Sequence, residues 1–257
     1  MLRRISQRCQ RTLTRTTAIS GVGFLTGRDI TVRFIPASAD EGIKFVRADL
    51  PGRPATPAHV SSVTGTSRRT TLGGEEGVSL VEHVLAALAA LRIDNCTVEL
   101  NAPEPPGLDG SCQGFVDALT DAGTRTLPAP RHAYTPERAV TVTAGNASLT
   151  LHPAENTELT ITYMLDYGAT SPIPRQIHTH QFSTGEFARR IAPCRTFLLS
   201  DEVEAFRKQG LGARTSFEDL LVFGPGGVMG NRLRFGDEPA RHKVLDILGD
   251  LALTGFD

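Results

Sequence analysis

Residues 79–100, SLVEHVLAALAALRIDNCTVEL, contain the clearest change of pattern along this chain. The part from 79 to 93 is rich in Ala and Leu and is apolar nearly all round, which predicts a helix buried in the protein. The part from 95 to 101 predicts a strand directly after the helix. We therefore expect helices and sheets to pack on one another.

The segments on either side of this stretch follow one order of elements. Short strands with Gly or Asp turns precede it, and a Pro/Gly loop and the helix 112–123 follow it. Beyond 124–137, which we predict to be a linker, we expect strands over 138–145, 147–154 and 158–167, a strand and a helix over 177–191, a helix over 201–210, strands over 216–225 and 231–235, and a last helix over 238–253. The repeated order predicts an α+β fold of two similar βα domains, 1–127 and 128–257, each a sheet with two packed helices, with the active site between them.

Composition and charge argue against several classes of protein. With 257 residues, 40% apolar and 21% charged, the chain suits one large or two ordinary globular domains. A formal net charge of -1 argues against non-specific binding of nucleic acid, and no apolar run is long enough to span a membrane. The four cysteines form no C-x-x-C pair, which favours free thiols in a reducing compartment. Residues 1–17 are rich in Arg and free of acids, as in a transit peptide, but the alternation in RTLTRTT favours a basic first strand.

His242, Asp246 and Asp250 lie four residues apart on the last predicted helix, and so along one stripe of its surface. This stripe has two interpretations. An exposed polar face would carry His–Asp pairs worth only about 0.2–0.5 kcal/mol each. Alternatively, an imidazole and a carboxylate one turn apart can bind one divalent cation, with Asp250 as an outer partner of the ligands.

Glu82 and His83 interrupt the apolar helix over 79–93. A charged Glu on a buried helix is costly unless it is paired or used, whereas at a helix start it would be hydrated and favoured by the helix dipole. The functional interpretation makes His83 a metal ligand and Glu82 a base. Because neighbours on a helix point about 100° apart, one side chain can bind a metal while the other reaches the water beside it.

The two helices together supply the ligands of a catalytic zinc site. His83, His242 and Asp246 are two imidazoles and a carboxylate, a set that leaves a fourth position open. Zinc would lower the pKa of water there to about 7, and Glu82 would accept its proton as the water attacks a carbonyl. Fe(II) also fits two histidines and a carboxylate.

Two further residues are candidates for contacts with a substrate. The hydroxyl of Thr196, in PCRTF between two helical segments, could donate to an oxyanion, or it could cap the helix that follows. Lys243, next to His242, could meet an anionic group of a substrate, although a single lysine is more often solvated.

A set of motifs follows in one order from Gln10 to the end of the chain: GVGFLTG, SLVEHVLAALAALRIDN, PEPPGLDGS, CRTF, QGL, LRF and RHKVLDILGDLAL. VEH alone would be a weak signal, whereas VEH followed by RHKxxDxxGD is specific. In these motifs the chain resembles the bacterial UDP-3-O-acyl-N-acetylglucosamine deacetylases, zinc enzymes of lipid A synthesis.

The resemblance implies two facing βα domains with zinc between them, and hydrolysis of the acetamide on a glucosamine ring with release of acetate. It assigns the zinc ligands to His83, His242 and Asp246, the general base to Glu82, the oxyanion contact to Thr196, the sugar-nucleotide contacts to Phe197 and Lys243, and the orientation of a catalytic histidine to Asp250. Asp109 matches a further acid of the family, although a turn would equally suit it. We expect a monomer, and the resemblance implies a cytoplasmic protein whose UDP-linked acylated glucosamine substrate brings it briefly to a membrane surface.

The chain departs from the family pattern at three places. Leu25 stands where the family has a histidine in G-V-G-L-H-S/T-G, and Arg214-Thr215-Ser216 stand where it has G-G-S, which leaves the acyl preference open. The family continues beyond Asp257 to a histidine that protonates the leaving amine, so we expect an incomplete second domain and a turnover lowered about 10²–10⁴-fold. His178 and His180 lie in a predicted strand and are not assigned to that role.

Three interpretations stay open from the sequence. The first is a zinc amidohydrolase of lipid A synthesis. The second is a non-catalytic homologue that binds zinc and a sugar nucleotide but turns over poorly. The third is a structural two-domain protein whose His and Asp residues form surface salt bridges. Zinc content separates the third from the others, and deacetylase activity separates the first from the second.

Overall fold

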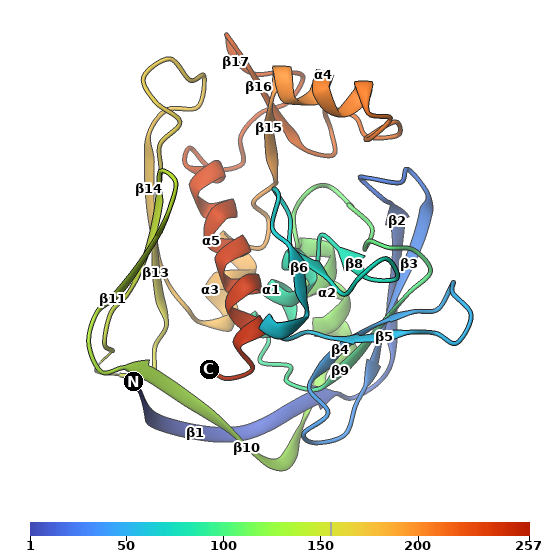
Figure 1. The fold of residues 1–257 in the computed structure, drawn as a ribbon, viewed down its shortest axis with the longest axis vertical. Coiled ribbons are helices and arrows are strands. Elements are labelled where there is room, and N and C mark those ends of the chain that lie inside the picture. Colours follow the sequence, from blue (N-terminus) through green and yellow to red (C-terminus); the bar gives the residue numbers. More distant parts are fainter. Residues whose placement is uncertain (155) are drawn as a thin grey trace.

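Helix α1 (Glu82–Ala90) lies in the interior of the molecule, as its apolar sequence predicts (Figure 1). Seven of its nine residues are buried, among them Leu85 and Leu88. The computed structural model describes residues 1–154 and 156–257. Over these residues five α-helices and several β-sheets confirm the α+β class. None of the helices in this described part is long and apolar enough to cross a membrane.

The first half of the chain is built on a five-stranded sheet in the order β2-β3-β9-β4-β5. Its strands are β2 (Thr17–Val22), β3 (Asp29–Pro36), β9 (Cys96–Leu100), β4 (Ile43–Arg47) and β5 (Ala55–Pro57), of which β4 and β9 are parallel. Val98 of β9 pairs with Phe34 on one side and Phe45 on the other, and all three are fully buried. These side chains belong to the core that surrounds α1.

Smaller elements complete the first half. They are η1 (Val60–Ser62), the three-stranded sheet of β6 (Val63–Gly65), β7 (Thr71–Leu72) and β8 (Val78–Ser79), and helix α2 (Gln113–Ala122). The β6–β7–β8 sheet leads directly into α1. Helix α2 packs against α1 and the large sheet, where Phe115 meets Phe34 edge to face.

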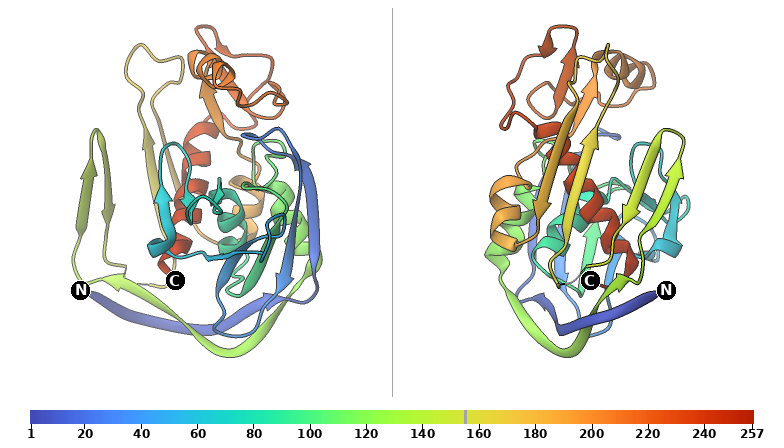
Figure 2. Two further views of the ribbon diagram at one scale, coloured as in Figure 1. Left: turned by 45° about the vertical axis from the view of Figure 1, so that its right-hand side comes forward. Right: turned by 90° about the vertical axis from the view of Figure 1, so that its left-hand side faces the viewer.

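A long antiparallel pair, β1 (Leu2–Leu13) and β10 (Thr124–Pro136), runs along one edge of the molecule and joins its two halves (Figures 1 and 2). The predicted basic first strand is confirmed over residues 2–13, although residues 14–16 of RTLTRTT interrupt it before β2, and the predicted linker over 124–137 is wrong. Proline is tolerated in such an edge ribbon at a bulge, and the register shifts between Cys9, which pairs with Pro130, and Arg11. The position between residues 127 and 128, where we placed the domain boundary, lies inside this one strand.

The strands of the second half belong to three small sheets. These are β11 (Val140–Ala144) with β12 (Ala147–Leu151), β13 (Thr160–Leu165) with β14 (Gln176–Gln181), and β15 (Phe197–Leu199), β16 (Leu221–Gly224) and β17 (Gly227–Val228). The helices are α3 (Thr184–Arg190), α4 (Ser200–Lys208), α5 (Glu238–Leu251) and η2 (Ala252–Thr254). The β11–β12 hairpin is exposed along its whole length and stands apart from its neighbours (Figure 2).

Residues 231–235, which we predicted to be a strand, have no strand geometry. Their backbone groups bond to side chains: Arg195 donates to the carbonyl of Arg232 at 2.7 Å, and the N–H of Arg234 donates to Glu238 at 2.6 Å. Arg195 and Glu238 form a buried ion pair with an N–O distance of 2.9 Å. The side chains of this ion pair thus bond to the backbone groups of Arg232 and Arg234, to which a neighbouring strand would otherwise bond.

Helices α1 and α5 pack directly against each other at Gly249. A Cβ atom at this position would lie 2.1 Å from the carbonyl oxygen of Glu82, so only glycine lets the two backbones approach this closely. The contact places the start of α1, with Glu82 and His83, beside the polar stripe of α5. Gly249, which has no side chain, thus lets the two helices that carry the candidate ligands, α1 and α5, pack together.

Gly249→Ala is expected to lower the free energy of unfolding by about 1–3 kcal/mol or more, because the clash is with backbone that cannot rotate away. This loss should outweigh the gain of about 1 kcal/mol that alanine has over glycine in a helix. Gly185→Ala in α3 is the matched control, since its Cβ would meet only the flexible side chain of Arg189, at 3.5 Å. Urea unfolding of both variants checks the prediction, and equal effects at the two positions would contradict it.

Candidate active site

His242 is held in one orientation by the chain itself. Its Nδ1 lies 3.0 Å from the carbonyl oxygen of Cys194, so that nitrogen carries the proton and donates it. The other ring nitrogen, Nε2, is buried and has no hydrogen-bond partner within the described residues. A buried imidazole whose free nitrogen lacks a partner has the geometry of a metal ligand with its supporting hydrogen bond already made.

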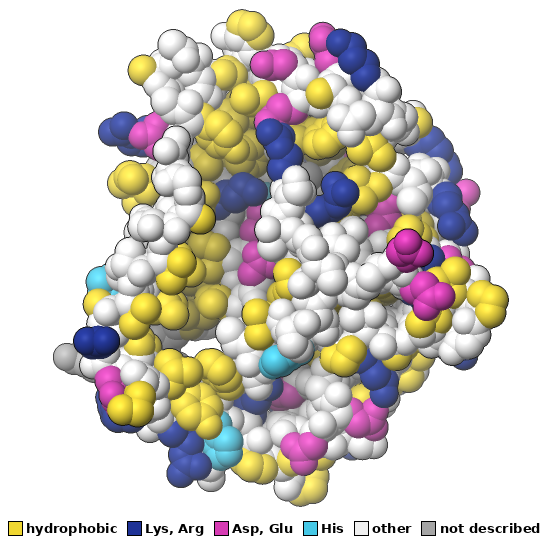
Figure 3. All heavy atoms as spheres, viewed as in Figure 1, with side chains coloured by type: hydrophobic (Ala, Val, Ile, Leu, Met, Phe, Trp, Pro, Cys, Tyr) yellow, Lys and Arg dark blue, Asp and Glu magenta, His cyan; other side chains and the backbone are white. Residues whose placement is uncertain are grey.

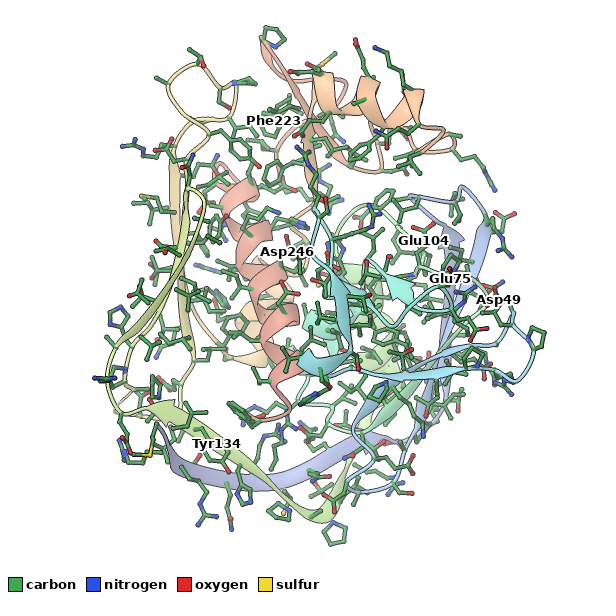
Figure 4. All side chains as sticks on the ribbon, in the orientation of Figure 1. Asp49, Glu75, Glu104, Tyr134, Phe223 and Asp246 are labelled. Carbon is green, nitrogen blue, oxygen red and sulfur yellow. The ribbon has the colours of Figure 1, made fainter. Side chains whose placement is uncertain are left out.

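Three ligand atoms from α1 and α5 converge at this nitrogen. Asp246 Oδ1 lies 3.4 Å from His242 Nε2 and 3.6 Å from His83 Nε2, and the three ligand atoms all lie within 4.8 Å of one another. Asp246 projects from α5 toward the first half of the molecule (Figure 4). The separations are those of atoms arranged around a common point, which is how the ligands of one cation are placed.

The protonation states of these three groups suit a cation. Burial lowers the pKa of His83 to about 4, with the neighbouring His242 as a further cause, and burial also lowers the pKa of His242. Burial would raise the pKa of Asp246, but Lys243 and the two histidines outweigh it and hold that pKa at about 2. At neutral pH the site therefore presents two neutral imidazoles and one carboxylate, the forms that bind metal.

Glu82 lines the cavity that contains the three ligand atoms, and its side chain is only 8% exposed. Its Oε1 accepts a hydrogen bond from the Thr70 N–H at 3.0 Å, while its buried Oε2 has no partner within residues 1–154 and 156–257. Burial, and next the charge of Asp246, raises the pKa of Glu82 to about 8. The interpretation of Glu82 as a hydrated residue at a helix start is therefore wrong, because α5 covers that helix start.

Glu82→Gln is expected to change the pH dependence of the metal-free protein. The ordinary carboxyl pKa of 4.5 is raised to about 8 in the folded state, so between these values the folded chain holds a proton that the unfolded chain has lost. The stability contributed by Glu82 is thus fully present below 4.5 and is lost as the pH rises, by about 1.4 kcal/mol per unit at most. The difference in free energy of unfolding between the variant and the parent, measured by urea unfolding across this pH window, should rise with pH, and a difference independent of pH would contradict the prediction.

Thr70 connects Glu82 with Asp250. Its backbone N–H donates to Glu82, and its hydroxyl donates to Asp250 Oδ1 at 2.7 Å. Burial raises the pKa of Asp250, although this hydrogen bond opposes the shift. Sequence reasoning missed Thr70, since nothing in the run RRTTLG distinguishes one threonine from the other.

Thr196 precedes β15 and lies at the wall of the metal-ligand cavity. It does not cap the following helix, because α4 begins only at Ser200. Its N–H donates to the carbonyl of Gly110 at 2.8 Å, and its own carbonyl accepts from the N–H of Leu221 at 2.9 Å. The fixed backbone presents the side chain at the cavity, which favours the oxyanion interpretation over the capping one.

Lys243 and Phe197 lie together beside the ligands. Lys243 Nζ donates to Asp246 Oδ2 at 2.9 Å and lies 5.4 Å from the centre of the Phe197 ring. The charge of Asp246 raises the pKa of Lys243 well above its ordinary value. Lys243 faces the cavity, whereas Phe197 is only 8% exposed and supports Lys243 and His242 from behind.

Asp109 shapes the loop before α2. Its Oδ1 accepts from the N–H and the hydroxyl of Ser111, and its Oδ2 pairs with Arg234 at 2.7 Å. Burial would raise the pKa of Asp109, but these partners outweigh it and lower the pKa. The turn interpretation accounts for the contacts with Ser111, whereas the ion pair with Arg234 ties this loop to the second half of the chain.

Two cavities meet at the candidate site. The smaller, about 70 Å³, contains the ligand atoms and is lined by Glu82, His83, Thr196, His242, Lys243 and Asp246 among others. The larger, about 150 Å³, is mostly apolar and shares Phe24, Arg68, Leu80 and Thr196 with the first. Figure 3 shows a hollow on this face, with basic side chains at its edge and hydrophobic side chains around it.

Leu25 lies in the wall of the larger cavity, where it adds to the apolar surface. A fully buried carboxylate, Glu104, holds its loop: it accepts from the N–H of Leu25 at 2.9 Å and from the N–H and hydroxyl of Thr26 at 2.7 and 2.8 Å. Figure 4 labels Glu104 beside the strands of the first half. Sequence reasoning missed this residue, whose only signal was an acid between prolines in PEPP.

Glu104→Gln is expected to lower the free energy of unfolding by about 1–3 kcal/mol, because the new amide group would face N–H donors without an acceptor of its own. The mobility of the Phe24–Leu25 loop should rise as well. Glu75→Gln changes the same chemistry at an exposed position and should have no measurable effect. Thermal unfolding and amide hydrogen exchange measure the two effects, and equal behaviour of the variants would contradict the role of Glu104.

Comparison with known proteins shows close relatives over nearly the whole chain. A sequence profile described as UDP-3-O-acyl N-acetylglycosamine deacetylase matches residues 10–257. A UDP-3-O-acyl-N-acetylglucosamine deacetylase of Thermosynechococcus vestitus is 41% identical over 96% of this chain and 85% of its own length. Proteins of the same name from Nostoc sp. and Brucella melitensis biotype 2 are 38% and 37% identical, each over 96% of this chain and 89% and 86% of their own lengths.

Proposed function

The chain belongs to the UDP-3-O-acyl N-acetylglycosamine deacetylase family, and from this premise we propose that it hydrolyses the N-acetyl group of UDP-3-O-acyl-N-acetylglucosamine, with zinc as its metal. The products are acetate and the free amine: water adds to the carbonyl carbon, the C–N bond then breaks, and the amine nitrogen takes the proton that Glu82 removed from the water. The single observation that supports this most is the convergence of His83, His242 and Asp246 in one cavity whose wall also holds a buried carboxylate, Glu82.

The donor set fits zinc. His242 is oriented by Cys194 and offers an Nε2 with no hydrogen-bond partner in the described part of the chain. The neutral imidazoles and the charged Asp246 need no change of protonation on binding. Two histidines and a carboxylate leave a coordination position open for the reacting groups. Zinc bound here would supply a Lewis acid for the acetamide carbonyl and would lower the pKa of water.

The chain's own residues account for the proton and the charge in the attack step. Glu82 accepts the proton of the attacking water at its Oε2, which has no partner among the described residues, while the bond from Thr70 keeps its Oε1 in place. The carbonyl oxygen becomes negative as the new C–O bond forms, and the hydroxyl of Thr196 donates a hydrogen bond to it. Lys243 attracts the phosphates of the sugar nucleotide, and Asp250 positions Thr70 and, through it, Glu82.

The larger cavity suits the 3-O-acyl group. Its walls are mostly apolar and it opens beside the ligand atoms, sharing Thr196 and Leu80 with the smaller cavity. An acyl chain bound there would lose its contact with water, worth about 0.8 kcal/mol for each methylene buried. The acyl group and the acetamide of one glucosamine ring would thus reach neighbouring cavities.

On the same basis we assign the reaction to lipid A synthesis in the cytoplasm, carried out by a monomer that meets the membrane surface only through its acylated substrate.

The test of the proposed function is direct. The purified chain is loaded with zinc, and both the bound metal and the acetate released from UDP-3-O-acyl-N-acetylglucosamine are measured. Stoichiometric zinc with acetate release is the expected result. Zinc without acetate would favour a non-catalytic homologue, and the absence of both would overturn the proposal.

A further inference from the structure

Leu80 has a backbone conformation that leucine rarely adopts. Its φ of 57° lies in the left-handed region, which suits glycine and asparagine but costs other residues free energy. Of the six non-glycine residues with such a φ in the described chain, Arg68 and Leu80 line both cavities of the candidate site. Arg68 lies in the β6–β7 loop, whereas Leu80 lies directly between β8 and α1. A left-handed leucine persists only where its surroundings hold it, and such residues are concentrated at functional sites.

Leu80 connects β8 to α1 with one sharp change of direction. β8 ends at Ser79, and Val81 already has helical backbone angles, with φ of -81° and ψ of -15°. One left-handed residue makes this change in a single step, whereas an extended residue would continue the strand and a right-handed one the helix. Leu80 therefore sets the direction in which α1 starts, and with it the directions of Glu82 and His83.

The chain is fixed on the strand side of this turn. Ser79 pairs with Thr71 of β7, their hydroxyl oxygens lie 2.9 Å apart, and the Ser79 N–H donates to the carbonyl of Pro103 at 2.8 Å. Thr70, whose N–H donates to Glu82 at 3.0 Å, directly precedes this strand pair. The donor that holds Glu82 and the start of the turn thus belong to one small sheet, so the angle of the turn decides whether Glu82 meets its donor.

The helix side of the turn is fixed as well. Val81 is fully buried, and its carbonyl accepts the first hydrogen bond of α1 at 2.9 Å. The backbone of Glu82 packs on Gly249 of α5, where there is no room even for a Cβ atom. Because both sides are held, a residue that resists the left-handed φ can be accommodated at position 80 only if the start of α1 is displaced.

We propose that Leu80 is a positioning residue of the site: its left-handed backbone, rather than its apolar side chain, directs Glu82 and His83 toward the metal-ligand cavity. This inference rests on the proposed function and adds a residue that acts through two others. The role in the turn and the role of a cavity wall predict opposite effects of substitution. A wall needs an apolar side chain, which valine keeps, whereas the turn needs a left-handed φ, which asparagine adopts far more readily than a β-branched residue.

The experiment compares Leu80→Val with Leu80→Asn in steady-state acetate release by the zinc-loaded chain. Leu80→Val is expected to lower kcat by about 10- to 100-fold, because a displacement of about 1 Å in a reacting group can cost 10²-fold, while KM changes little. Leu80→Asn should keep kcat close to that of the parent. Its KM should rise by about four-fold, the effect of one methylene group that is no longer buried.

Arg92 supplies the matched control. It follows α1 with a φ of 55°, is exposed and lines neither cavity. Arg92→Asn and Arg92→Val should leave kcat and KM unchanged, although valine should lower the free energy of unfolding at either position. Urea unfolding of all four variants measures this strain. A loss of stability in Leu80→Val with an unchanged kcat would make Leu80 a structural residue only and would overturn the inference.

Two further results would overturn the inference while the proposed function stands. One is a kcat that Leu80→Val keeps and Leu80→Asn loses, which would make Leu80 a wall residue. The other is an equal loss of kcat in both variants. If Leu80→Val does not fold, Leu80→Asn decides: a retained kcat supports the role of the backbone, and a lost kcat overturns it.

A second readout keeps the inference apart from the proposed function. If the parent chain releases no acetate, the proposed function fails, and the affinity for zinc then tests the turn through His83. Leu80→Val should weaken zinc binding by about ten-fold, the effect of disturbing the support of a ligand, and Leu80→Asn should leave it unchanged. Equal zinc affinities of the two variants would overturn the inference in that case.

Discussion

Glu82→Gln is expected to lower the turnover of the zinc-loaded chain by about 10²–10⁴-fold, the usual effect of removing a general base. The variant keeps the size of the side chain and its bond from Thr70, but the amide cannot accept the proton of the attacking water. Glu82 is not among the three converging ligand atoms, so zinc affinity should change little. Acetate release under single-turnover conditions, together with bound zinc, measures the two quantities separately.

Two outcomes would count against this role of Glu82. If turnover fell no further than in Glu204→Gln, exposed on α4, the base would have to be another group. If zinc were lost along with activity, Glu82 would be a ligand or a structural support instead. An activity that rises with pH in the parent and is flat in the variant would support the role, because only the deprotonated carboxylate accepts a proton.

His242→Ala is expected to weaken zinc binding by about 10²–10³-fold. A site of four ligands contributes about 10–16 kcal/mol, so one ligand is worth roughly 2.5–4 kcal/mol. Because the substitution also leaves the carbonyl oxygen of Cys194 without its donor, the free energy of unfolding of the variant is measured beside its zinc affinity. Competition with a chromogenic chelator measures the affinity in the parent and the variant.

The matched control for His242→Ala is His59→Ala. His59 is exposed, bonds to Ser61 and is not among the residues that line the metal-ligand cavity. This change should leave zinc affinity unaltered. Unchanged zinc affinity in His242→Ala, with a folded protein by circular dichroism, would exclude His242 as a ligand and would favour the interpretation of the α5 stripe as salt bridges.

Local sequence patterns were sufficient wherever neighbouring residues decide the structure. The apolar run over 79–93 produced the buried helix α1, and the spacing of His242 and Asp246 placed both on one stripe of α5. The basic start of the chain formed the strand β1, although the alternating run RTLTRTT extends beyond its end at Leu13. Propensity misjudged 124–137 and 231–235, because a partner strand orders the first and the buried Arg195–Glu238 pair orders the second.

The sequence by itself determined which residues could form the site and the helices that carry them, since i, i+4 spacing and apolar periodicity are properties of a single helix. Only the tertiary structure decided that His83 Nε2 and Asp246 Oδ1 lie 3.6 Å apart. It also decided that α5 buries Glu82 and so raises the pKa of its carboxyl group, and that Thr70 bonds to both Glu82 and Asp250. These are contacts between segments far apart in the chain, and they exist because Gly249 lets α1 and α5 touch. Distances and desolvation depend on which surfaces meet, and no local pattern records that.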